Sequence, residues 1–378
     1  MKLLHLSDLH IGKRVNNFSM IEDQKYILNE ILEIIDREKP DGVMIAGDIY
    51  DRSIPSEEAV DLFDWFLVNL VRREAEIFII SGNHDSAERL SFGHKIMDAC
   101  NVHISPVYEK DICSFRLHEG KTDEVGIYLL PFIKPVNVRT KYPEEKIETY
   151  TDAVRVAIKH MDIDPEKINI LMAHQFVTGA GRSESEEISV GGLDNVDAEA
   201  FDGFDYVALG HLHGPQSAGR DTVRYAGSPL KYSFSEETQK KSVTVVEITA
   251  KDDIRVREVE LKAKKDMKTI RGNFNDLMAK SFYEGTTLKE DYVRVILTDE
   301  EDVPDAITKL RTVYRNVMEM AYDNRRTRNS ASLEQLKEIE KVTPSQLFSD
   351  FYKQMNGKEM SEEQKKIVDD LVEKIWED

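Results

Sequence analysis

One short stretch, from Asp41 to Asp51, constrains the fold of this chain more than any other. Residues 43–46 form an unbroken apolar run, which predicts a strand buried on both faces of a parallel sheet. Gly47 ends the run and Asp48 follows it at once. A carboxylate there lies at the carboxyl end of a central strand, where open α/β sheets place their chemistry. A single aspartate in this position is more often a turn former or a helix cap.

The pattern gains weight because it recurs four more times. Polar donors follow apolar runs at Asp8 and His10, Asp48, Asn83 and His84, His174, and His211 and His213. Oxygen and imidazole donors without sulfur suit manganese, iron or zinc. They are too many for one ion of about four to six ligands, so we expect two ions that share a carboxylate. Asp48, on the central strand, is the natural bridge, and two ions about 4 Å apart can clamp a phosphate and hold an attacking hydroxide.

Other residues near these motifs allow more than one interpretation. Asp51 and Asp85 either orient the histidines from behind or form turns and caps, and the sequence does not decide between these roles. His5 lies inside the first expected strand and is predicted to be a core residue. The remaining histidines lack the strand-end context and are expected to be structural or on the surface: His94, His103, His118 and His160.

Apolar periodicity predicts an alternation of strands and helices in the first part of the chain. We expect strands at 2–6, 41–46 and 77–80 and helices at 20–37 and 56–73, which together indicate a parallel sheet. A strand at 127–130, a helix at 149–161 and a strand at 168–173 follow. The alternating segments 223–225, 243–248 and 254–259 predict an antiparallel sheet.

The rest of the chain is expected to form smaller units. The lysine-rich segment 262–268 and the polar segment 324–332 are predicted linkers. Between them, 274–322 indicates helix, strand, helix, strand. The tail carries two helical apolar stripes, at 347–355 and 367–375, and Ser361 with Gln364 fits a capping box. These helices either pack on the chain itself or dock on a partner. The predicted domains are 1–265, 272–322 and 333–378.

Composition limits the classes of function. The formal net charge of −20 argues against a simple nucleic-acid binder, so DNA binding would need local positive charge from side chains, metal ions or a partner. Two cysteines without a Cys-x-x-Cys pair, a short apolar N-terminus and the lack of a long apolar run predict a cytoplasmic protein with reduced thiols and no membrane segment.

The motifs resemble a known superfamily. Asp8-x-His10, Gly47-Asp48-x-x-Asp51, Gly82-Asn83-His84-Asp85 and Gly210-His211-x-His213, in this order, look like those of the calcineurin-like metallophosphoesterases. The chain is similar, more narrowly, to the SbcD family, the nuclease subunits of bacterial SbcCD complexes. The segments that carry this closer resemblance are 1–10, 173–176, 190–192 and 225–232. It implies a four-layer α/β/β/α sandwich with a small α/β capping domain and a C-terminal helical tail.

The resemblance also implies an activity and a site. One ion would be held by Asp8, His10, Asp48 and His213, and the other by Asp48, Asn83, His174 and His211. His84 would face the scissile phosphate as a catalytic residue. The family uses Mn²⁺ for 3′→5′ exonuclease action on duplex DNA ends and endonuclease action on single strands and hairpins, in repair, replication and recombination. The implied partners are the coiled-coil base of an SbcC-type ATPase, DNA, and a second copy of the chain in a heterotetramer.

Alternatives remain open from the sequence. Within the superfamily, the metal site also suits a phosphodiesterase or phosphatase for nucleotides or phosphoproteins. A metal-binding scaffold without turnover is less well supported, because the ligand set is complete. The candidate phosphate contacts, each equally explained as a solvated surface charge, are Lys13, Arg14, Arg52, Arg89, Lys231 and Lys240.

Overall fold

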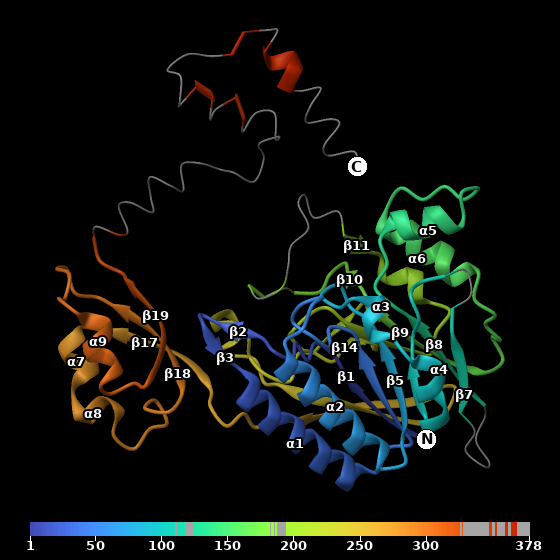
Figure 1. The fold of residues 1–378 in the computed structure, drawn as a ribbon, viewed down its shortest axis with the longest axis horizontal. Coiled ribbons are helices and arrows are strands. Elements are labelled where there is room, and N and C mark those ends of the chain that lie inside the picture. Colours follow the sequence, from blue (N-terminus) through green and yellow to red (C-terminus); the bar gives the residue numbers. More distant parts are fainter. Residues whose placement is uncertain are drawn as a thin grey trace.

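Two six-stranded sheets form the centre of the computed structural model. The structure describes residues 1–109, 112–117, 124–181, 183–184, 186, 194–325 and 327, with tail pieces at 348–349, 352–353, 360–361 and 364–368. Figure 1 shows the two sheets packed together, with a third, small sheet at one end of the molecule.

The first sheet has the strand order β16-β15-β1-β4-β5-β6. Its parallel strands are β1 (Lys2–Leu6), β4 (Gly42–Ala46), β5 (Glu76–Ile80) and β6 (Val102–Ile104). The antiparallel strands β15 (Ser242–Ala250) and β16 (Asp253–Glu260) complete it. Helices α1 (Ile21–Glu38) and α2 (Glu57–Val71) cover its outer face, because their apolar stripes share one core with the strands.

The second sheet has the order β13-β14-β12-β9-β8-β7. These strands are β13 (Gln216–Ala218), β14 (Arg220–Tyr225), β12 (Tyr206–Gly210), β9 (Ile168–His174), β8 (Val125–Leu130) and β7 (Ser114–Leu117). Helices α5 (Pro135–Lys141) and α6 (Tyr150–Lys159) cover its outer face. The four inner strands of this sheet run parallel.

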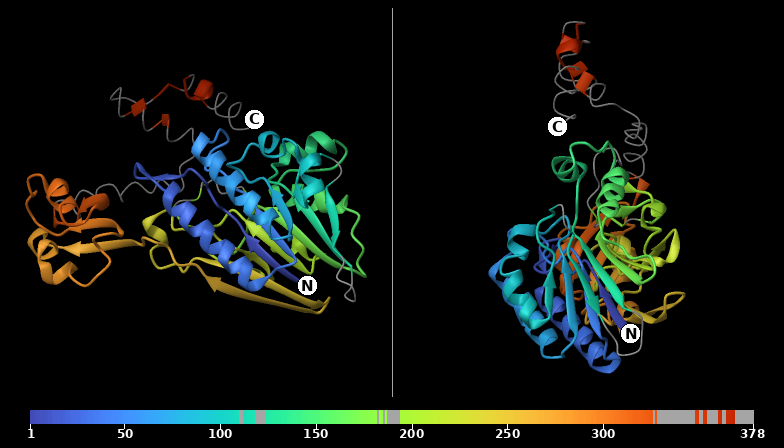
Figure 2. Two further views of the ribbon diagram at one scale, coloured as in Figure 1. Left: turned by 60° about the horizontal axis from the view of Figure 1, so that its bottom comes forward. Right: turned by 90° about the vertical axis from the view of Figure 1, so that its right-hand side faces the viewer.

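Strand β4 shows why the sheets form layers. Val43 and Ile45 point into the core shared with α1 and α2, whereas Met44 and Ala46 point into a separate core between the two sheets. Side chains from the second sheet, such as Met172, fill that same inner core. The four-layer α/β/β/α prediction is therefore confirmed, and Figure 2 shows the helices outside the paired sheets.

The expected antiparallel sheet is confirmed for two of the three segments and is wrong for the third. The segments 243–248 and 254–259 pair antiparallel, but 223–225 belongs to the other sheet. β14 pairs parallel with β12 in the second sheet, while β15 and β16 extend the first sheet as a hairpin. Alternation of apolar and polar residues indicates a strand but not its neighbour, so the sequence could not assign these strands to different sheets.

The small unit is a three-stranded parallel sheet with its own core. It consists of β17 (Met267–Gly272), α7 (Phe274–Met278), α8 (Lys280–Tyr283), β18 (Tyr292–Leu297), α9 (Ala306–Arg311) and β19 (Asn316–Tyr322). Leu277, Val295 and Tyr314 are buried in its core. The sequence placed the start of β17 in a linker, because the lysines beside it hide the short apolar pattern.

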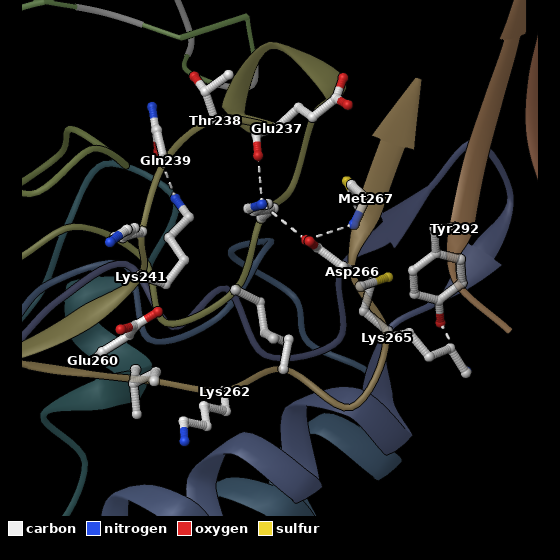
Figure 3. Close-up of a pocket in the computed structure, with 16 residues that line it drawn as sticks. Glu237, Thr238, Gln239, Lys241, Glu260, Lys262, Lys265, Asp266, Met267 and Tyr292 are labelled. Carbon is white, nitrogen blue, oxygen red and sulfur yellow. Dashed lines mark hydrogen bonds and ion pairs between the residues drawn. The ribbon is translucent and has the colours of Figure 1, made fainter. Parts of the chain in front are cut away.

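A cavity of about 360 Å³ lies where the small unit meets the rest of the chain (Figure 3). Lys231 bridges this junction, since its Nζ lies 2.8 Å from Asp266 Oδ1. Tyr292 of β18 donates a hydrogen bond of 2.6 Å to Asp23 of α1. The small unit is thus attached to the two-sheet part by polar contacts and by Met267, Tyr292 and Met318, which pack in the core of the first sheet.

Short elements complete the described chain. They are β2 (Arg14–Val15), β3 (Phe18–Ser19), α3 (Ala87–Leu90), α4 (His94–Met97), η1 (Asp98–Cys100), β10 (Phe176–Val177), β11 (Asn195–Val196), η2 (Ala198–Phe201) and η3 (Phe234–Glu236). None of the described helices is long and apolar enough to cross a membrane.

Most of the predicted tail lies outside the described residues. The capping box is confirmed, because Ser361 N–H donates to Gln364 Oε1 at 3.0 Å and Gln364 N–H donates to Ser361 Oγ at 3.3 Å. The two-helix tail, its partner-binding role and the division of the chain at 1–265, 272–322 and 333–378 stay predictions.

Candidate metal centre

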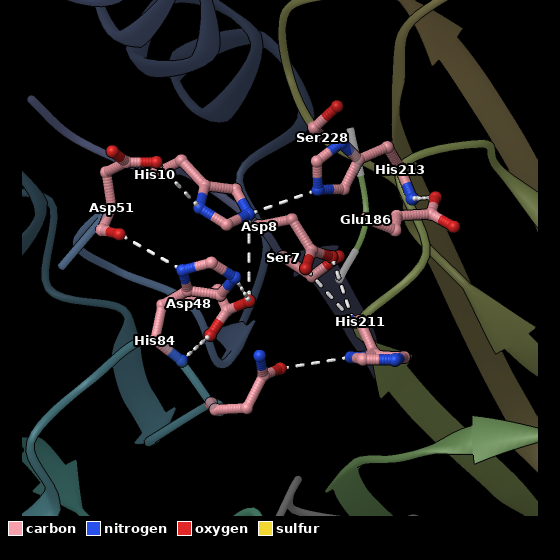
Figure 4. A network of polar contacts seen from close by, with 12 residues as sticks. Ser7, Asp8, His10, Asp48, Asp51, His84, Glu186, His211, His213 and Ser228 are labelled. Carbon is pink, nitrogen blue, oxygen red and sulfur yellow. Dashed lines mark hydrogen bonds and ion pairs between the residues drawn. The ribbon is translucent and has the colours of Figure 1, made fainter. Parts of the chain in front are cut away.

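Five strand ends meet at one edge of the paired sheets. β1, β4 and β5 come from the first sheet and β9 and β12 from the second. Figure 4 shows side chains that follow β1, β4, β5 and β12 facing one another. Backbone hydrogen bonds join the loops: Asp8 N–H donates to Gly47 O at 3.1 Å, and His10 N–H donates to Asp48 O at 2.9 Å. The predicted convergence of these residues is therefore observed.

The backbone of the site is strained. Asp8, His10 and Asp48 have φ angles of 52°, 44° and 50°, and His211 has 105°. Left-handed conformations cost non-glycine residues roughly 1–3 kcal/mol each and persist where surrounding structure enforces them. Such strain clusters at functional sites, so its concentration at four candidate site residues supports a functional role.

Two glycines make room for the histidines and carboxylates. A Cβ at Gly47, whose φ is +87°, would lie 2.4 Å from His174 Nδ1. A Cβ at Gly210 would lie 1.9 Å from Ala46 O. Neither the His174 ring nor the Ala46 carbonyl can move away, because the two are in contact with each other: His174 Nδ1 lies 2.8 Å from Ala46 O. Glycine is required at both positions for the two sheets to approach this closely.

One group of donors gathers around the end of β1. Ligand atoms of Asp8, His10 and His213 all lie within 4.8 Å of one another. The Nε2 atoms of His10 and His213 are 3.1 Å apart. All three side chains are buried. Two imidazole nitrogens and a carboxylate that converge in a buried space match the donor set of a divalent cation.

A second group surrounds Asp48. Its Oδ2 lies 3.3 Å from His174 Nε2 and 3.6 Å from His10 Nε2, so one carboxylate faces both groups. Asn83 Oδ1 lies 3.0 Å from His174 Nε2 and 3.0 Å from His211 Nδ1. An amide oxygen between two imidazoles and beside a carboxylate is a place for a second cation.

The electrostatics of the cluster favour bound cations. Burial raises the pKa of Asp8 to about 6, and the nearby charge of Asp48 adds to the rise. Burial also opposes ionisation of Asp48, but the charge of His174 and the hydrogen bond from its ring outweigh burial and lower the pKa of Asp48 well below its usual value. Two buried carboxylates this close repel each other, and a divalent ion between them would remove the repulsion. The residues present therefore fit two cations.

His84 lies at the rim of the cluster. Its Nε2 is 4.0 Å from Asp48 Oδ2, and its Nδ1 is 3.0 Å from the carbonyl oxygen of Asp51. Its ring meets that of His10 edge-on with centroids 4.8 Å apart. His84, His10 and Asp48 also form a group close enough to hold an ion. Its role beside the phosphate stays a prediction.

The structure separates the roles of the two flanking aspartates. Asp51 Oδ1 lies 3.6 Å from His10 Nδ1 and 2.7 Å from Lys13 Nζ, so it stands behind a candidate ligand. Asp85 accepts backbone N–H groups of Gly82, Ile49 and Tyr50, at 2.9 to 3.1 Å. Asp85 thus holds the turns after β4 and β5, whereas Asp51 lies beside His10 without a hydrogen bond to its ring, and its orienting role stays a prediction.

Sequence reasoning missed several residues behind the histidines. Glu236 lies 3.4 Å from His213 Nδ1, and Lys241 is buried beside Glu236. Burial opposes ionisation of Glu236, but His213 and Lys241 outweigh it, so its pKa is well below the usual value. Glu186 accepts the N–H of His213 at 2.6 Å. No strand-end motif marks these residues; a glutamate and a lysine beside the apolar β15 were the only signals.

Comparison with known proteins extends this picture. The family model described as calcineurin-like phosphoesterase matches residues 1–215. A second model, described as a type 5 capsule protein repressor C-terminal domain, matches residues 263–356. The SbcD subunit of the SbcCD nuclease from Staphylococcus epidermidis is 33% identical over 98% of each chain. That of Staphylococcus saprophyticus is 32% identical over 100% of this chain and 99% of its own. This chain belongs to the SbcD family of calcineurin-like phosphoesterases.

Membership of the SbcD family makes the chain a metal-dependent phosphodiesterase, a hydrolase of ester bonds. It also confirms the resemblance found in the sequence motifs. A crystal structure of a dimetal phosphatase from Danio rerio gives a TM-score of 0.41 at 10% identity and covers 69% of this chain and 98% of that one.

The candidate phosphate contacts lie in two places. Near the site of this SbcD-family chain, Lys13 pairs with Asp51 and Arg89 donates to Ser53 O at 2.8 Å, while the side chain of Arg52 is 79% exposed. Arg14 donates to Asn17 O at 2.5 Å. Lys231 and Lys240 instead line the junction cavity of Figure 3. Their contact with DNA stays a prediction.

Proposed function

We propose that this chain is the nuclease subunit of an SbcCD-type complex and that it hydrolyses DNA phosphodiesters with two divalent ions. We propose Mn²⁺ as the metal. The observation that carries the proposal is the position of Asp48, whose Oδ2 faces His10 from one sheet and His174 from the other. Membership of the SbcD family supports the nuclease assignment.

The proposed ligand sets follow the two groups of donors. Asp8, His10, Asp48 and His213 would hold one ion, and Asp48, Asn83, His174 and His211 the other. The distances of 3.1 Å between His10 and His213 and of 3.0 Å from Asn83 Oδ1 to each of its two imidazoles support this division. Such ions polarise a phosphoryl group and activate water as a nucleophile.

The side chains of the protein supply the rest of the chemistry. His84 would donate a hydrogen bond from Nε2 to the phosphoryl oxygens and protonate the leaving oxygen. The contact of its Nδ1 with Asp51 O supports this role, because it fixes the ring with Nε2 toward Asp48. With the Nδ1 proton donated to Asp51 O, the ring donates from Nε2 only when Nε2 also carries a proton, and that proton would pass to the leaving oxygen.

The DNA activities are part of the proposal. They are 3′→5′ exonuclease action on duplex ends and endonuclease action on single strands and hairpins, in repair, replication and recombination. We propose the cytoplasm as the compartment, in keeping with the free thiols of Cys100 and Cys113. An SbcC-type ATPase would bind the tail, residues 333–378, through its coiled coil.

A homodimer within a heterotetramer is proposed as the assembly. Phe92 and Ile96 support it, because they are 82% and 78% exposed and lie four residues apart beside α4. Two large apolar side chains that exposed are costly in water and mark an interaction surface. They follow directly after the His84 motif, so a dimer formed there would place two metal centres near a shared DNA path.

A digestion experiment tests the function. Purified chain with Mn²⁺ would be incubated with linear duplex, hairpin and circular single-stranded DNA, beside a small phosphodiester such as bis(p-nitrophenyl) phosphate. Cleavage of the DNA substrates that stops with EDTA is the expected result. Hydrolysis of the small ester with every DNA substrate intact would reject the nuclease assignment in favour of a small-molecule phosphodiesterase.

A further inference from the structure

A buried pair of opposite charges lies directly behind His213. Glu236 is 0% exposed and Lys241 is 5% exposed. One oxygen of Glu236 lies 3.4 Å from His213 Nδ1, and the other accepts a hydrogen bond of 2.5 Å from Lys241 Nζ. Burying two charges costs several kcal/mol per ion before their attraction is counted. A buried ion pair of this cost, next to a candidate metal ligand, indicates that the pair has a function at the site.

Lys241 contacts the backbone of His213 as well as the carboxylate behind its ring. Its Nζ donates to His213 O at 2.8 Å and to Ser228 Oγ at 3.0 Å, and it lies 2.8 Å from Gln239 Oε1. One ammonium therefore ties together the main chain of His213 and the group that its side chain faces. Figure 4 shows His213 and Ser228 side by side in the cluster, and Figure 3 shows the contact of Lys241 with Gln239.

We propose that Glu236 and Lys241 are positioning residues that hold His213 as a metal ligand. The inference rests on the proposed function, in which His213 binds one of the two ions. Glu236 accepts the proton of Nδ1, so Nε2 keeps its lone pair and faces the Nε2 of His10, 3.1 Å away. Lys241 holds the Glu236 carboxylate in place, and the negative charge of Glu236 offsets the cost of burying the Lys241 ammonium.

The neighbouring residues provide matched controls. Glu237 follows Glu236 but faces the small unit, where its Oε1 accepts the N–H of Thr269 at 3.0 Å. Lys240 precedes Lys241 and is exposed, at the junction cavity. Substitutions at Glu237 and Lys240 thus change the same charges on the same segment without touching His213.

The experiment measures Mn²⁺ binding by calorimetry and by electron paramagnetic resonance. Removal of a group that supports a ligand typically weakens metal binding by about 10–100-fold. We expect Glu236→Gln and Lys241→Met to weaken the binding of one ion by about that factor and to leave the affinity for the other ion unchanged. The paramagnetic resonance spectrum should then change from that of two coupled manganese ions to that of a single ion. Glu237→Gln and Lys240→Met should bind both ions as the unsubstituted chain does.

The double variant Glu236→Gln/Lys241→Met separates positioning from charge balance. Neither member of the pair is left buried without the other, so the double variant should fold more readily than the single ones, and continued loss of one ion would support positioning. Two normally bound ions in the double variant would overturn the inference, as would equal weakening of both ions in every variant. His213→Ala reports on the proposed function instead: two retained ions in that variant would show that His213 is not a ligand.

Discussion

The Nε2 atoms of His10 and His213 lie 3.1 Å apart, although 203 residues separate them in the chain. His10 follows β1 of the first sheet, and His213 follows β12 of the second. Both rings are buried, and burial lowers the pKa of His10 to about 3. Two imidazole nitrogens that face each other across the boundary between the sheets form a site where one cation would join the two halves of the sandwich.

Metal binding should therefore stabilise the fold, and this stabilisation should depend on Asp48, the proposed ligand of both ions. Free Mn²⁺ at 100 times its dissociation constant adds about 2.7 kcal/mol to the free energy of unfolding for each independent site. We expect the melting temperature to rise with Mn²⁺ and fall with EDTA. Asp48→Asn should show no such response and should lack both ions by elemental analysis. Two ions per chain in that variant would show that Asp48 is not the shared ligand.

The contribution of Asp8 to the stability of the metal-free protein should fall as the pH rises through 6. Burial raises the pKa of Asp8 from 3.8 to about 6 in the folded state. The folded chain therefore binds this proton more tightly than the unfolded chain, and the stabilisation is complete below about pH 3.8 and lost as the pH rises through about 6. Asp8→Asn carries no titrating group, so its advantage over the unsubstituted protein should grow by up to about 3 kcal/mol between pH 4 and pH 7.

Urea unfolding of the EDTA-treated proteins at several pH values measures this difference. Asp61→Asn, on the exposed face of α2, is the control and should give a difference that does not change with pH. A constant difference between the Asp8→Asn variant and the unsubstituted chain would contradict the buried-carboxylate explanation.

The sequence predicted the convergence of the metal residues for a physical reason. Each candidate follows an apolar run, and the ends of parallel strands meet at one edge of a sheet, so position along the chain was enough to bring Asp8 and Asp48 together. It was also enough for His174, whose strand β9 is buried throughout. These residues are specified by local pattern and by sheet topology together.

Other features depend on contacts that no local pattern records. Glu236 lies in a 3-10 turn, and only the fold places it behind His213. β14 has the alternation of any half-buried strand, so its parallel partner could not be inferred. β17 is short and flanked by lysines, which resemble the charged residues of a linker. Tertiary packing decides all three.

Substitution of the exposed apolar pair should abolish the proposed dimer. Phe92→Asp and Ile96→Asp place a charge in a surface that would be buried between two copies, so we expect a monomer in analytical ultracentrifugation. Val136→Asp, at a side chain that is 55% exposed on α5, is the control and should leave the association unchanged. A dimer of unaltered affinity in both variants would place the interface elsewhere.

Deletion of residues 333–378 should separate catalysis from assembly. All candidate metal residues precede this segment, so Mn²⁺-dependent cleavage of single-stranded DNA should remain. Binding to an SbcC-type partner should weaken, because the deletion removes both apolar stripes of the tail. A pull-down with equal recovery of partner would contradict the docking role, and an unfolded truncated chain would show that the tail packs on the rest of the protein.

His84 offers the sharpest test of how the site works. Asn83 and His84 are adjacent, yet Asn83 Oδ1 lies between His174 and His211 while the His84 ring turns toward Asp51.

A residue that only donates a hydrogen bond or a proton to the substrate can be removed without loss of metal. Proton transfer of this kind contributes about 10²–10⁴ to the rate. We expect His84→Ala to bind both Mn²⁺ ions and DNA normally in calorimetry, and to cleave at least about 100-fold more slowly in single-turnover reactions. His160→Ala is the control, because the His160 ring stacks on that of Tyr142, outside the candidate metal cluster. Loss of one ion in His84→Ala would make His84 a ligand, as its 4.0 Å distance from Asp48 permits. Cleavage at the normal rate would leave His84 with a structural role.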